Sequence, residues 1–330
     1  MARVRQPQRM EEISNWLRQG RITPADALQM AIELRKRRTA APRAQGKPAD
    51  TAQDQQRRIQ AVIGELEGLV GLGQVKQLVR ELQAYIAIQL RRARAGLASE
   101  PSTLHMIFTG NPGTGKTTVA RLLGRLLKEM GVLPKGHMVE VERADLVGEY
   151  IGHTAQRTRE IVRKATGGIL FIDEAYSLAR GGERDFGKEA IDYLVRAMEE
   201  HRGELVLILA GYPDEMAWFL RQNPGLRSRF ALTLHFPDYT AEELVAIGEM
   251  MLRRRDYQLT PDGRAALRQI LRGQAWLTAG EHGNARAMRN LVERAIRCQA
   301  LRLVDRPDAT REELMAITRA DLEDAVAALA

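Results

Sequence analysis

The sequence predicts an α/β protein whose core is a parallel sheet of five strands, followed by a small helical domain. One observation is a set of five short, strongly apolar segments of strand length. A second is that helical spacing fills the stretches between them, which is typical of a parallel sheet covered on both faces. A third is that only helical patterns follow residue 240. The predicted strands are His105–Thr109, His137–Glu142, Gly168–Asp173, Leu205–Ala210 and Leu232–Phe236.

The composition indicates a globular protein of more than one domain. The 330 residues are 44% hydrophobic and 28% charged, a balance that excludes a disordered chain. Cys298 is the single cysteine, so no internal disulfide can form, which suits a reducing compartment. No apolar run is long enough to span a membrane, and the first residues lack a signal-peptide core. We therefore expect a soluble, cytoplasmic protein.

The positive charge is concentrated at the start of the chain. The net charge is +8, but the first 60 residues hold thirteen Lys and Arg against six Asp and Glu. The rest of the chain is nearly neutral. The basic run Arg35–Arg38 is explained by a solvated helix end, where cations suit the helix dipole. We therefore do not expect nucleic-acid binding.

Four regions follow from these patterns. Residues 1–38 read as two amphipathic helices, and residues 39–57 have the Pro- and Ala-rich composition of a flexible linker. The α/β domain is expected over 58–238, with a long helix before its first strand. The helical domain is expected over 239–330. It opens with a capping box at Thr240 and Glu243, and its last helices are predicted over Asn284–Val304 and Arg311–Leu329.

The segment "GNPGTGKTTVAR" predicts a phosphate-binding loop between the first strand and a helix. Its glycines allow the backbone N–H groups to point at phosphate oxygens, and the helix N-terminus adds a positive dipole end. Lys116 can reach the β- and γ-phosphates, and the Thr117 hydroxyl can bind Mg²⁺. A tight turn alone would explain the glycines but not the Lys–Thr pair. The predicted ATP contacts are Gly110, Asn111, Pro112, Gly113, Thr114, Gly115, Lys116, Thr117 and Thr118.

A pair of carboxylates follows the third predicted strand. Asp173 and Glu174 end the apolar segment "GGILFIDEA". Beside the phosphate loop, Asp173 can hold Mg²⁺ through water and Glu174 can polarise the attacking water. A solvated turn is the alternative for such a pair taken alone. Together with the loop, the pair predicts ATP hydrolysis rather than a nucleotide switch.

Six segments in a fixed order resemble the AAA+ ATPases over residues 60 to 325. They are "GNPGTGKTTVARLLG", "LVGEYIGHTAQRT", "GGILFIDEAYSLA", "LILAGYPDEM", "NPGLRSRF" and "GNARAMRNLVERA". Within that family they resemble the branch that contains stage V sporulation protein K and the red-type Rubisco activases, and the N-terminal helices look closer to the former. The resemblance implies a P-loop NTPase core with a helical lid, and Mg²⁺-dependent ATP hydrolysis.

The resemblance also implies roles for further residues. Arg227 or Arg229 would be an arginine finger that enters the nucleotide site of a neighbouring subunit, with a surface salt bridge as the alternative. Arg286 would be the lid arginine that senses the γ-phosphate, with Arg289 as the next candidate. Val70 and Gly71 would contact the adenine. Tyr212 lies nearest the position of the first sensor, where many relatives have Asn, Ser or Thr, and we leave it outside the catalytic set.

The same resemblance implies a ring, expected to be a homohexamer, with Tyr150, Ile151 and Gly152 on a loop that grips a protein client in the central pore. Burial of Tyr150 against the body is the alternative. We therefore expect an ATPase that remodels or threads a protein partner, in sporulation or as a Rubisco-activase-like factor. A nucleic-acid motor and a non-catalytic, nucleotide-gated scaffold are the competing hypotheses.

Overall fold

The computed structural model describes residues 52–98, 103–148, 150, 152–180, 185–273 and 283–328. The chain divides into two compact units, Met1–Asp54 and Gln55–Ala330, and nearly all described residues belong to the second. The helices predicted over residues 1–38 and most of the predicted linker lie outside the described residues. No helix in the described part is long and apolar enough to cross a membrane.

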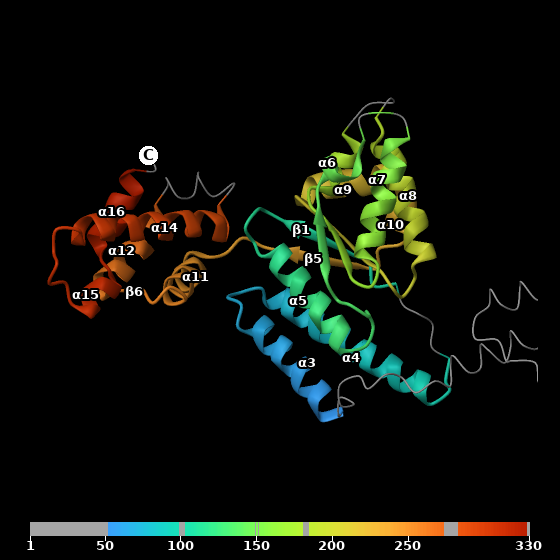
Figure 1. The fold of residues 1–330 in the computed structure, drawn as a ribbon, viewed down its shortest axis with the longest axis horizontal. Helices are drawn as coiled ribbons and strands as arrows, with labels where there is room; N and C mark the ends of the chain where they lie inside the picture. The colour runs from blue at the N-terminus through green and yellow to red at the C-terminus, as the bar shows by residue number, and fades with distance from the viewer. Residues whose placement is uncertain are drawn as a thin grey trace, which may run out of the picture. The chain divides into compact units, whose positions relative to one another are not determined.

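A parallel sheet of five strands forms the centre of the α/β domain (Figure 1), as predicted. The strand order is β2-β3-β4-β1-β5, so β1 lies between β4 and β5. Because all neighbouring strands are parallel, their carboxyl ends share one edge, where residues that follow β1 and β3 can meet. The bounds are β1 Met106–Gly110, β2 Met138–Val141, β3 Ile169–Ile172, β4 Val206–Gly211 and β5 Leu232–Phe236.

Helices cover both faces of this sheet (Figure 1). Successive residues of a strand point to opposite faces, and the apolar side chains on each face pack against the helices on that side. Phe108 packs on one side with α3 (Ala52–Glu67), α4 (Gly73–Arg94) and α5 (Lys116–Glu129). Ile107, one residue earlier, packs on the other side. The elements on that side are α6 Arg143–Leu146, α7 His153–Ala165, η1 Ala175–Ala179, α8 Gly187–Glu200, α9 Pro213–Gln222 and α10 Pro224–Arg227.

Helix α3 begins within the segment that was predicted to be a linker. The linker was expected to reach residue 57, but α3 already begins at Ala52. The cause is an apolar stripe, Ile59, Val62 and Leu66, whose side chains are at most 9% exposed and belong to the core shared with α5. Residues 52–57 form the first turns of the helix that carries this stripe. The Pro- and Ala-rich composition before them made the predicted linker too long at its C-terminal end.

The helical domain after the sheet, which we call the lid, opens with the predicted capping box. The Thr240 side chain accepts a hydrogen bond from the Glu243 backbone, and the Glu243 side chain accepts one from the Thr240 backbone. A short parallel pair, β6 with β7, adds to the predicted helices. The lid elements are α11 Ala241–Arg253, β6 Gln258–Leu259, α12 Pro261–Arg272, α14 Asn284–Leu303, α15 Arg311–Met315, β7 Ala316–Ile317 and α16 Arg319–Ala327.

The single helix predicted over Arg311–Leu329 is wrong, because β7 interrupts it. Thr318 starts α16 with a capping box of its own, in which its backbone N–H and its hydroxyl both donate to Asp321, each at 2.8 Å. A Thr–x–x–Asp pattern within an apolar periodic stretch is a helix start signal that the periodicity concealed.

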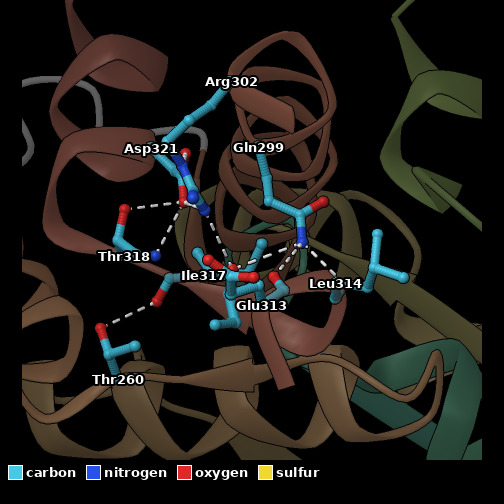
Figure 2. Close-up of polar contacts among 9 residues, drawn as sticks. Thr260, Gln299, Arg302, Glu313, Leu314, Ile317, Thr318 and Asp321 are labelled. Carbon is cyan, nitrogen blue, oxygen red and sulfur yellow. Dashed lines mark hydrogen bonds and ion pairs between the residues drawn. The ribbon is translucent and has the colours of Figure 1, made fainter. Parts of the chain in front are cut away.

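Asp321 is also the centre of a polar cluster that holds the lid together (Figure 2). Arg302 of α14 donates to both carboxylate oxygens of Asp321, at 2.8 and 2.9 Å. Gln299, one turn earlier, donates to the Leu314 carbonyl at 2.7 Å. Burial alone would raise the pKa of Asp321, but the hydrogen bonds from Arg302 and Thr318 hold this pKa below its usual value. The cluster therefore fixes the last helices of the lid around an ionised, buried carboxylate.

Replacement of Arg302 by Met is expected to destabilise the protein by about 2 kcal/mol, because a buried carboxylate loses its charged donor. Urea unfolding followed by circular dichroism measures the change. Arg319→Met is the matched control, since the Arg319–Glu323 pair is exposed on both sides and is worth about 0.5 kcal/mol. Equal effects of the two substitutions would contradict the role given to the cluster.

Candidate active site

The phosphate loop joins β1 to α5 at the carboxyl edge of the sheet. Helix α5 begins at Lys116, directly after Gly115, whose φ of 99° is in the left-handed region. Gly113 has a φ of 74°, and a Cβ there would lie 2.9 Å from the backbone nitrogen of Arg286 and 3.0 Å from the Gly283 carbonyl. Only glycine therefore allows the loop to curl in this way beneath the first turn of α14.

The Lys116 ammonium lies over this loop. Its Nζ donates to the carbonyls of Gly110 at 2.7 Å and Asn111 at 2.8 Å. Burial lowers the pKa of Lys116, Asp173 acts in the opposite direction, and the positive charge of Arg286 lowers it further. These charges place Lys116, Asp173 and Arg286 in one electrostatic neighbourhood, which is suited to a polyanionic ligand.

The two predicted carboxylates lie where β3 ends. The backbone N–H of Asp173 donates to the Val141 carbonyl at 2.9 Å, which ties this residue to the end of β2. Its side chain accepts a hydrogen bond from the Glu174 backbone at 3.0 Å. Glu174 has a φ of 46°, a left-handed conformation that costs about 1–3 kcal/mol in a residue other than glycine. The strained backbone therefore lies at Glu174, the residue predicted to polarise the attacking water.

One cavity of about 760 Å³ brings most predicted residues together, a volume in the range of small-molecule sites. The phosphate loop and helix α5, the carboxylate pair, the ends of β2 and β4, the segment before α4 and the lid all contribute to its lining. The predicted residues that line it are Val70, Gly110, Pro112, Gly113, Gly115, Lys116, Thr117, Thr118, Asp173, Glu174 and Arg286.

Three residues predicted to contact nucleotide have other surroundings. The Asn111 amide donates to Asp238 at 3.0 and 2.9 Å. Thr114 is fully buried, and its hydroxyl donates to the Asn111 carbonyl at 2.8 Å. A Cβ on Gly71 would collide with the Glu243 carboxylate, so this residue packs against the start of α11. These three residues shape the loop and its neighbours, and Val70 beside Gly71 lines the cavity.

Arg227 and Arg229 lie outside this cavity. Arg229 forms an ion pair with Glu199 at 3.0 Å and donates to the Gly225 carbonyl at 2.7 Å. Arg227, at the end of α10, is exposed, and the described part of the chain offers its side chain no hydrogen bond or ion pair. Within a single chain, neither arginine therefore lines this cavity.

The predicted pore loop precedes α7, and its aromatic side chain faces solvent. Tyr150 is 66% exposed and lies edge-on to the ring of His153, with ring centres 5.5 Å apart. Ile151 lies outside the described residues, and Gly152 caps α7 with a φ of 83°. Two fully buried threonines hold the base of the loop, since Thr154 accepts from the Gly148 backbone at 2.9 Å and Thr158 donates to the Leu146 carbonyl. Burial of Tyr150, the alternative reading, is wrong for this chain.

Two tyrosines near the cavity were not predicted as site residues. Tyr212 lines the cavity, although the sequence left it outside the catalytic set. Tyr239 also lines it, and its hydroxyl donates to the Thr114 carbonyl at 3.0 Å. Burial, with a smaller contribution from Glu243, raises the pKa of Tyr239 to about 12, so it stays a neutral donor. The aromatic in "FPDYT" directly before the lid was the available signal.

The donor set fits Mg²⁺ with a nucleotide phosphate. The Thr117 hydroxyl and the Asp173 carboxylate line the same cavity and are hard oxygen ligands of the kind that this ion prefers. Curled backbone N–H groups and Lys116 supply the complementary positive potential for phosphate oxygens.

Two family models match most of this chain. Residues 106–238 match the family described as "ATPase family associated with various cellular activities (AAA)", and residues 240–329 match its AAA lid domain. Stage V sporulation protein K of Bacillus subtilis is 52% identical over 78% of this chain and 80% of its own length. The chloroplastic ribulose bisphosphate carboxylase/oxygenase activase of Cyanidioschyzon merolae is 45% identical over 81% and 92% of the two chains. Protein CbbX of Cereibacter sphaeroides is 50% identical over 73% and 78%.

Solved structures share the fold at low sequence identity. The FIGL-1 AAA domain in complex with ADP superposes with a TM-score of 0.56 at 19% identity, covering 80% of this chain and 83% of that one. A mutant RuvB of Thermotoga maritima gives 0.53 at 20% identity, covering 80% and 72%.

Proposed function

This chain belongs to the AAA family of ATPases, and we propose that it assembles into a ring, a homohexamer, that uses ATP hydrolysis to remodel or thread a protein partner through a central pore. The observation that carries this proposal is Tyr150, a largely exposed aromatic on a loop with a buried, hydrogen-bonded base. Exposed apolar contact on an anchored loop can grip an extended polypeptide without reading its sequence.

The residues of the cavity can divide the hydrolytic work. Loop N–H groups and Lys116 bind the phosphates, and Glu174 orients and polarises the attacking water. Thr117 and Asp173 would hold Mg²⁺, which would supply positive charge to the phosphate oxygens when bound. Arg286 on the first turn of α14 carries the state of the γ-phosphate to the lid.

The position of Arg227 and Arg229 outside the cavity supports assembly. A finger arginine that cannot reach the site of its own chain can complete the site of a neighbouring copy, where it stabilises the transferring phosphoryl group. Hydrolysis then depends on the contact between two copies of the chain.

The relatives support two processes for the protein client. The sporulation protein is 52% identical and the Rubisco activase 45%, so we propose a role in sporulation first and Rubisco-activase-like remodelling second. The near-neutral charge outside the first 60 residues disfavours a nucleic-acid motor or loader. A single cysteine supports placement in the cytoplasm.

Dilution is expected to lower the ATPase rate per chain, because each site needs an arginine from a second copy. The measurement is phosphate release over a wide range of protein concentration, with sedimentation velocity in the presence of ATP to identify the assembled species. A rate that stays constant while the protein sediments as a monomer would contradict the ring. Stimulation of the rate by DNA, and not by an unfolded protein, would favour the nucleic-acid motor instead.

A further inference from the structure

A second polar network joins the phosphate loop to the lid, centred on the carboxylate of Asp238. This residue lies two positions after the end of β5 and before α11. The side-chain amide of Asn111 donates to both of its oxygens, and the amide of Asn284 donates to Oδ1 at 2.7 Å. One carboxylate thus holds a residue of the phosphate loop and the first residue of α14.

Asn284 makes more contacts than this one. Its side-chain oxygen accepts a hydrogen bond from the Tyr239 backbone at 3.0 Å, and its amide lies 3.3 Å from the Pro112 carbonyl. The next backbone N–H, of Ala285, donates to the Gly113 carbonyl at 3.2 Å. Asn284 is 5% exposed, so these contacts are shielded from water.

The backbone and the hydrogen bonds require the same residue type at this position. Asn284 has a φ of 39°, in the left-handed region that Asn tolerates better than other residues with a Cβ. Its amide supplies a donor for Asp238 and an acceptor for the Tyr239 backbone at once. Glycine would fit the backbone but not make the bonds, and aspartate would place a second carboxylate against Asp238.

We propose that Asp238 and Asn284 form a latch that fixes the start of α14 on the phosphate loop and thereby positions Arg286 at the cavity. Both are positioning residues, since they act through the loop and through Arg286. The proposal depends on nucleotide binding at this site and not on ring assembly or threading. Loosening the latch should let bound nucleotide leave faster.

The test exchanges the two side chains. In Asn284→Asp two carboxylates oppose each other, and in Asp238→Asn two amide groups compete, so each single variant should release a fluorescent ATP analogue about tenfold faster, the equivalent of one charged hydrogen bond. In the double variant Asp238→Asn/Asn284→Asp the amide has moved to position 238 and can donate to the carboxylate at position 284, whose other oxygen still accepts from the Tyr239 backbone. The Pro112 carbonyl loses its amide donor in this variant, so release should return part of the way to the parent rate and be slower than in either single variant.

Two further variants separate the latch from general stability. Asn290→Asp makes the same chemical change at an exposed position of the same helix and should leave release unchanged. Asn284→Gly keeps the left-handed backbone and should still accelerate release. Hydrogen exchange on the nucleotide-free protein should rise at residues 283–287 in both single variants and fall again in the double variant.

The outcomes are distinct. Single variants with a lower melting temperature but parental release would overturn the latch, as would a double variant that releases faster than either single one. A parent protein that does not bind the analogue at all would instead overturn the nucleotide site on which the inference depends.

Discussion

Replacement of Glu174 by Gln is expected to stop most ATP hydrolysis while ATP stays bound. The amide keeps the size of the side chain but cannot accept a proton from water, so phosphate release should fall by about 10²-fold or more. The Lys116 ammonium, the loop N–H groups and Asp173 are untouched, so equilibrium binding of a fluorescent ATP analogue should be close to that of the parent.

Glu160→Gln, on the exposed face of α7, is the matched control and should hydrolyse ATP at the parental rate. Parental turnover in Glu174→Gln would contradict the assignment and would favour the non-catalytic, nucleotide-gated scaffold. If the assignment holds, the same variant is the reagent of choice for capturing a protein client in the ATP state.

Loss of both candidate finger arginines is expected to have an effect at least as large. The double variant Arg227→Ala/Arg229→Ala should hydrolyse ATP about 10³-fold more slowly, since an arginine finger is worth that much or more. Its own cavity is complete, so ATP binding should persist. The exposed Arg221→Ala is the control, and the single variants identify which arginine acts.

A mixing experiment shows whether the arginine acts between copies. A subunit without the arginines keeps Glu174, and a Glu174→Gln subunit keeps the arginines, so a mixed assembly contains some complete sites. Two nearly inactive proteins should therefore regain activity when mixed. Failure to regain activity, when an affinity tag on one variant co-purifies the untagged other variant, would contradict a finger supplied in trans.

Much of the fold was predictable because its signals are local. The inner strands β1, β3 and β4 are short runs buried on both faces, so their apolar character survives in the sequence, and the edge strands β2 and β5 keep enough apolar residues to be recognised. The phosphate loop is encoded by consecutive residues, 110–118, and Asp173 directly follows β3. Each prediction needed only a short window of sequence.

The parts that were missed depend on distant contacts. The pairing of Gln258–Leu259 with Ala316–Ile317 involves two residues on each side, too few to leave a strand pattern. Asp238 and Asn284 are separated by 46 positions, and no local motif indicates that their side chains meet. The Thr318 break was visible as a capping box but was outweighed by apolar periodicity.

Hydrogen bonds connect the loop that carries Tyr150 to the acidic pair, through the segment after β2. Thr154 and Thr158 fasten the loop to the segment after β2, and the Val141 carbonyl at the end of that strand bonds the Asp173 backbone. A client that resists movement would therefore strain the strand ends beside Asp173. In the proposed ring, the rate of ATP hydrolysis would therefore depend on the force that the client exerts on Tyr150.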